Sequence, residues 1–70
     1  MLYDYGERMF EIMKEKNVEE EELRKKAKIP ISIMHGFLWY NLSIDFIQFE
    51  RMLKVLDVSV VEFFSVDKGK

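Results

Sequence analysis

The chain contains no cysteine, one proline, one histidine and three glycines among its 70 residues. The absence of cysteine excludes a disulfide framework and thiolate chemistry, and one histidine cannot supply the ligands of a typical structural zinc site. No nucleophile or carboxylate accompanies His35 at a spacing that suits catalysis. We therefore expect a binding protein that is not an enzyme and that uses no catalytic residue, metal, cofactor or small-molecule ligand.

Long apolar runs and a strong positive charge are also missing. No segment approaches the roughly 20 apolar residues that span a bilayer, and the first residues lack the basic start of a signal peptide. Together with the lack of cysteine, this predicts a cytoplasmic protein without a membrane partner. The formal net charge of −2 provides no overall attraction to phosphate, so any contact with nucleic acid depends on local charge.

The residues that are present suit one small globular domain, because 49% of the chain is hydrophobic. We assign this domain to residues 1–65 and a polar C-terminal tail to residues 66–70. A core of this size gives only marginal stability unless close packing or association adds to it.

Apolar residues recur at spacings of three and four, which predicts five short helices. We expect the first from near Asp4, its N-cap, to Lys16, with Asn17 as a left-handed stop. The second begins in the acidic run Glu19–Glu22 and ends at Ala27. The order of charges in it, acidic first and basic last, is also typical of a solvated helix that complements its dipole.

Pro30 interrupts the helical pattern and separates the second helix from a third, expected from Ile31 to about Trp39. Ser43 is the expected N-cap of the fourth, in which Phe46 and the apolar residues up to Leu56 recur at helical spacing. Ser59 caps a fifth helix that ends near Phe64, with Glu62 completing a capping box. Short helices joined by short connections predict an all-α, compact, orthogonal bundle, with a helix-turn-helix candidate at helices two and three.

Four segments resemble the Cro/C1-type (Xre-family) helix-turn-helix domain of phage repressors and small regulators, in an ungapped register over about 60 of the 70 residues. Tyr5-Gly6-Glu7-Arg8-Met9 matches the opening Leu-Gly-Glu-Arg-Ile. Glu15-Lys16-Asn17-Val18-Glu19-Glu20-Glu21-Glu22-Leu23-Arg24 matches Glu-Lys-Gly-Leu-Ser-Gln-Glu-Glu-Leu-Ala. Lys26-Ala27-Lys28-Ile29 matches Lys-Ala-Gly-Ile, and Leu56-Asp57-Val58-Ser59-Val60-Val61-Glu62-Phe63-Phe64 matches Leu-Gly-Val-Ser-Leu-Asp-Glu-Phe-Phe.

The resemblance implies a lambda repressor-like fold and a DNA-binding transcriptional regulator that acts as a dimer on double-stranded DNA. Many members pair an Arg in helix one with a Glu in helix three, and this chain has Met13 and Leu38 at those positions. A buried ion pair can be replaced by packed apolar residues without loss of stability. We therefore expect Leu38 to join the core, with Met34 and Phe37 on the same inner face.

Few residues suit DNA at the positions where the family contacts it. Ser32 and His35 are the hydrogen-bonding side chains at the base-contacting positions, where an Ile can offer only contact with a thymine methyl group. Glu20 replaces a Gln that commonly contacts phosphate, and a carboxylate there repels phosphate. The expected phosphate contacts are three lysines that follow in the chain: Lys25, Lys26 and Lys28.

Apolar residues occupy other positions where the family usually has polar, charged or Gly residues. Six of them can form an exposed interface, for a homodimer or for another regulatory protein: Ile31, Ile33, Trp39, Tyr40, Leu42 and Ile47. A contiguous exposed apolar patch usually marks an interaction site. Alternatively, Trp39 and Leu42 fold inward and enlarge a thin core. The sequence therefore leaves two functions open, a DNA-binding regulator and a protein-protein interaction module that has kept the fold but lost DNA binding.

Overall fold

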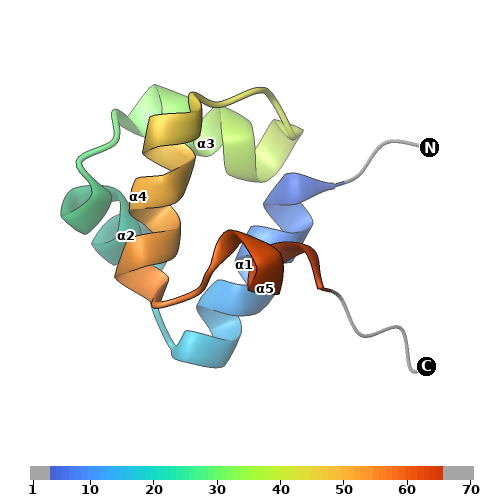
Figure 1. Cartoon of the computed structure of the whole chain (residues 1–70). Coiled ribbons are helices and arrows are strands. Elements are labelled where there is room, and N and C mark those ends of the chain that lie inside the picture. The colour runs from blue at the N-terminus through green and yellow to red at the C-terminus, as the bar shows by residue number, and fades with distance from the viewer. Residues whose placement is uncertain (1–3, 66–70) are drawn as a thin grey trace.

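The structure is a computed structural model that describes residues 4–65, in which five helices and no strand occur (Figure 1). The helices are α1 (Tyr5–Lys16), α2 (Glu20–Ala27), α3 (Ile31–Tyr40), α4 (Phe46–Leu56) and α5 (Val60–Phe64). The predicted all-α class is confirmed, and the predicted helices lie within a few residues of the observed ones. The tail predicted at residues 66–70 lies outside the described residues.

Side-chain caps fix the starts of three helices. The Asp4 carboxylate accepts a hydrogen bond from the backbone N–H of Glu7 (2.9 Å) at the start of α1, and Ser59 forms the predicted capping box with Glu62 at the start of α5. Ser43 was predicted as the N-cap of α4, and this prediction was wrong. Asp45 caps the helix instead, since its carboxylate accepts a hydrogen bond from the N–H of Ile47 (2.7 Å). Ile44 is partly buried against the core in the segment before α4, and the helix begins only beyond it.

Four helices end at a residue in the left-handed conformation, and none of these residues is glycine. They are Asn17, Lys28, Asn41 and Asp57, with φ between 53° and 59°. In each case the N–H of the cap residue donates to a carbonyl of the preceding turn, which is how a left-handed residue satisfies the free carbonyls of a helix end. The left-handed stop predicted at Asn17 is confirmed.

The core lies where α1 packs on α3 and α2 packs on α4 (Figure 1). Met13 and Leu38 are both buried, as was expected for two apolar residues at these positions, and Met34 and Phe37 are buried with them. Phe46 shares the apolar spacing of α4, which predicts a buried side chain. It is instead 60% exposed, because it is the first residue of that helix.

Two residues of α1 fix its position against other helices. Gly6 leaves room for the α3 backbone, because a Cβ atom on Gly6 would collide with the carbonyl oxygen of Leu38. Arg8 holds α5, since its guanidinium donates to the carbonyl oxygens of Phe63 (2.6 Å) and Glu62 (3.0 Å). The Arg8 contacts join the two ends of the described chain.

Candidate functional site

The first turn of α3 presents apolar and polar side chains together. Ile31 is 65% exposed and Ile33 is 39% exposed, and the Ser32 side chain between them is also exposed. His35 follows on the exposed side, whereas Met34 is fully buried. The structure therefore places Ser32 and His35, the two predicted base-contacting residues, at the surface of the same helix.

The N-terminal end of α3 has no carboxylate to neutralise its dipole. Its first turn contains no acidic residue, and its N-cap, Pro30, provides no side-chain hydrogen bond. The other helices of residues 4–65 each have an acidic residue in the first turn or an aspartate cap. Since a helix N-terminus has a partial positive charge, the start of α3 favours an approaching anion.

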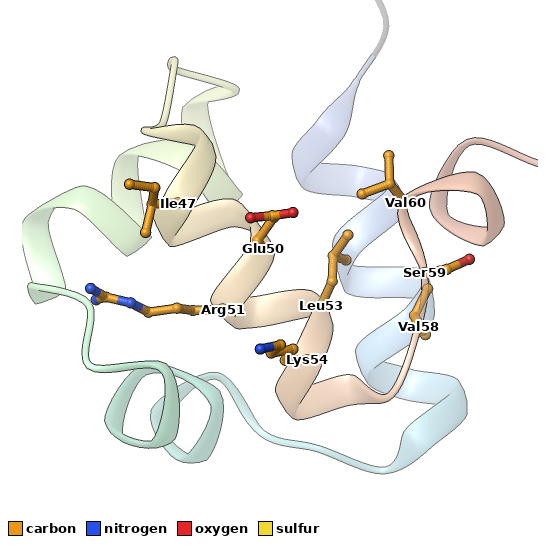
Figure 2. A pocket seen from close by; sticks show the side chains of 8 residues that line it. All are labelled: Ile47, Glu50, Arg51, Leu53, Lys54, Val58, Ser59 and Val60. Carbon is orange, nitrogen blue, oxygen red and sulfur yellow. The ribbon is translucent and has the colours of Figure 1, made fainter.

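Two cationic residues lie near this end of α3. Lys28 is exposed in the connection between α2 and α3. Arg51 extends from α4 toward the same connection, as Figure 2 shows, and its Nη1 donates a long hydrogen bond (3.5 Å) to the carbonyl oxygen of Lys28. Arg51 was not among the predicted site residues, because its approach to Lys28 depends on the packing of α2 against α4 and leaves no local signal in the sequence.

The other two predicted phosphate-binding lysines are paired with acidic residues of their own helix. Lys25 Nζ lies 3.2 Å from a carboxylate oxygen of Glu21, and Lys26 Nζ lies 3.0 Å from one of Glu22. These exposed i,i+4 pairs contribute little stability, but each carboxylate offsets the positive charge of its lysine. We therefore expect Lys28 to attract phosphate more strongly than Lys25 or Lys26.

Glu20 connects the start of α2 to the exposed side of α3. One of its carboxylate oxygens accepts a hydrogen bond from Trp39 Nε1 (3.3 Å), and the other lies 4.0 Å from His35 Nδ1. The Trp39 ring also contacts the Phe10 ring edge to face, with 5.1 Å between centroids. The negative charge of Glu20 therefore lies against the middle and end of α3, away from its first turn.

The six predicted interface residues are all exposed, so the alternative in which the linker folds inward is wrong. Trp39 is 57% exposed and Leu42 is 59% exposed. Leu42 lies over Gly36, where its Cδ1 is 3.1 Å from the position a Cβ atom would take. The connection after α3 runs back over that helix to the start of α4 (Figure 1). Leu42 lines one hollow together with Phe46, the first residue of α4, and Ile47 follows Phe46; both are exposed.

Two surface hollows flank α4. The first, of about 360 Å³, is lined by α4 and the connection to α5, and contains Glu50 as well as Arg51 and Lys54 (Figure 2). The second, of about 490 Å³, is lined mainly by aromatic rings such as Phe37, and no charged residue among residues 4–65 lines it. Within residues 4–65 there is neither a cluster of acidic and histidine side chains suited to a metal ion nor a helix long and apolar enough to cross a membrane.

Comparisons of this chain with protein families, with curated proteins and with solved structures found no match. The structure establishes an all-helical architecture for residues 4–65, and the surface around α3 carries the exposed residues that bear on function.

Proposed function

We propose that this chain is a lambda repressor-like helix-turn-helix domain of the Cro/C1 type that binds double-stranded DNA as a dimeric transcriptional regulator. The observation that supports this most strongly is the backbone conformation of Asn17, Lys28 and Asp57. These are the three positions at which the family pattern has Gly and this chain has another residue type, and all three residues are left-handed and directly follow a helix. Glycine after a helix commonly adopts this conformation.

The left-handed backbone at these three positions supports the proposal independently of the resemblance in sequence, because this chain does not share the family's Gly there. A left-handed lysine is strained, so the path of the chain, and not local preference alone, accounts for Lys28 in this conformation. The family often has a Gly at the position of Tyr40, and here the neighbouring Asn41 is left-handed instead. α3 therefore ends at Tyr40, one residue beyond the end expected from the sequence.

The first turn of α3 is the part that would enter the major groove, since the N-terminal residues of a recognition helix contact base edges. Its uncompensated dipole and the nearby Lys28 and Arg51 would attract the DNA backbone, while Ser32 and His35 would donate to or accept from bases. Three exposed apolar residues away from that first turn, Trp39, Leu42 and Ile47, would serve the dimer. The carboxylate of Glu20 lowers the affinity for DNA, so we expect weak non-specific binding.

Binding to a random-sequence duplex at increasing salt tests this proposal. The K28A/R51A double variant should weaken binding and reduce the slope of log K against log salt by about 2, because each phosphate contact contributes about 0.9. K14A/K16A is the matched control, because it removes the same charge from the far end of α1. No binding at low salt, or an equal loss in both double variants, would count against the proposal.

A protein-protein interaction module is the second candidate, and the exposed apolar side chains around α3 and the start of α4 favour it. Ile47 is the best probe because it is exposed, whereas Trp39 is also held by Phe10 and Glu20 within the chain. The mass in solution of Ile47→Lys should fall to that of a monomer, with Val61→Lys, an exposed residue of α5, as the control. An oligomer that persists in Ile47→Lys would exclude Ile47 from the interface. Association without DNA binding would favour this second candidate.

A further inference from the structure

We infer that α3 recognises thymine methyl groups through Ile31 and Ile33, so that the preferred DNA site has T·A pairs where the first turn of α3 meets the major groove. The inference rests on the proposed DNA-binding function and adds the kind of base that the site selects.

The first turn of α3 presents three exposed side chains. Ile31 and Ile33 are both exposed and stand before and after the exposed Ser32 in the sequence, so two of the three exposed side chains at the start of the helix are branched and apolar. A helix that enters the major groove by its N-terminal end brings these three side chains nearest to the base edges. Two of the three can make only apolar contacts.

The major groove offers one apolar group to such side chains, the C5 methyl group of thymine. Bidentate recognition of guanine requires Arg or Lys, and that of adenine requires Asn or Gln. None of these four residue types occurs between Ile31 and Tyr40. The helix therefore lacks the side chains that most often select purines directly.

The same side chains disfavour G·C pairs. An Ile packed against guanine O6 or N7, or against the amino group of cytosine, removes water from a polar atom and supplies no hydrogen bond in return. Contact with a thymine methyl group instead buries apolar surface on both partners. The two isoleucines therefore favour a T·A pair in two ways, by contact with its methyl group and by the cost of contact with a G·C pair.

Replacing thymine by uracil tests the inference, because uracil keeps every hydrogen-bonding group of thymine and lacks only the methyl group. The preferred duplex is first selected by the protein from a random-sequence library. Duplexes with deoxyuridine at one thymidine position at a time are then compared with the parent by fluorescence anisotropy. We expect binding to weaken about fourfold for each methyl group that Ile31 or Ile33 contacts.

Variants assign the effect to the two residues. I31S and I33S should bind the thymine and uracil duplexes equally at the position that each residue contacts, whereas V61S on α5 should keep the preference of the natural chain. Both isoleucines are exposed, so folding should persist, and the circular dichroism spectrum and thermal unfolding verify this for each variant.

The outcomes separate this inference from the proposed function. Salt-dependent DNA binding with equal affinity for thymine and uracil duplexes would overturn the inference and leave the DNA-binding function standing. The same conclusion would follow if the selected sites had G·C pairs throughout. No DNA binding at low salt would overturn both.

Discussion

Gly6 and Gly36 both lie inside helices, but a side chain at each position would meet different neighbours. A Cβ atom on Gly6 would collide with backbone carbonyls of α3, which cannot move without moving the helix, whereas on Gly36 it would meet only the flexible side chain of Leu42. We expect Gly6→Ala to lower the free energy of unfolding by about 1–3 kcal/mol. Gly36→Ala should change it little or raise it by up to about 1 kcal/mol, since Ala favours the helix.

Urea unfolding followed by circular dichroism measures both glycine variants in the same way. If Gly6→Ala were as stable as the natural chain, α1 and α3 would not approach as closely as the structure shows. If Gly36→Ala were the more damaging change, the space that Leu42 occupies beside α3 would be tighter than its flexible side chain suggests.

Single residues also show where sequence reasoning fails. Asn17 was predicted as a left-handed stop because Asn tolerates that conformation, and the structure confirms it. The left-handed conformation of Lys28 and Asp57 was not predicted, although the resembling family pattern has Gly at both positions. Lys by itself does not indicate a left-handed backbone, and Asp adopts one only occasionally.

At the scale of an element, α5 is too short to be stable alone, and Arg8 and the capping box fix its two ends. Arg8 donates to two carbonyl oxygens at the end of α5, and its guanidinium also lies 6.0 Å from the centre of the Phe63 ring. Arg8→Lys keeps the charge but loses the paired donors, so we expect a loss of about 1–3 kcal/mol in the free energy of unfolding.

Glu11→Ala is the matched control for Arg8, because it removes only the partner of the exposed ion pair between Arg8 and Glu11 (3.2 Å). Such a pair contributes at most about 1 kcal/mol. Urea unfolding should therefore separate the two variants. Equal losses would mean that the carbonyl contacts of Arg8 do not stabilise α5.

The helices themselves were predictable, because apolar spacing and N-caps are local features. The start of α4 was not, since Ser43 and Asp45 are both good caps, and the choice depends on Ile44 packing against the core before the helix begins. For the same reason Arg51 could not be placed beside Lys28 before α2 and α4 were seen to pack together.

For the whole molecule, the sequence predicted the class of fold and the exposed side of α3, but it left the course of the linker after α3 open. The structure shows that Trp39 and Leu42 remain exposed, so this surface is available to a partner. The structure also shows that acidic and basic side chains lie at different parts of α3. The carboxylate of Glu20 lies against the middle and end of α3, whereas Lys28 and Arg51 lie toward its start. A net charge of −2 alone does not reveal such a division.

The measurement that tests the central claim most directly is a titration of the isotope-labelled protein with a short duplex at low salt, followed by amide NMR spectra. If α3 enters the major groove by its N-terminal end, the largest changes in amide chemical shift should fall between Lys28 and His35. Smaller changes should occur near Arg51, and the amide of Val61 on α5 should not change. Unchanged spectra, or shifts confined to residues away from the start of α3, would contradict the proposed DNA-binding surface.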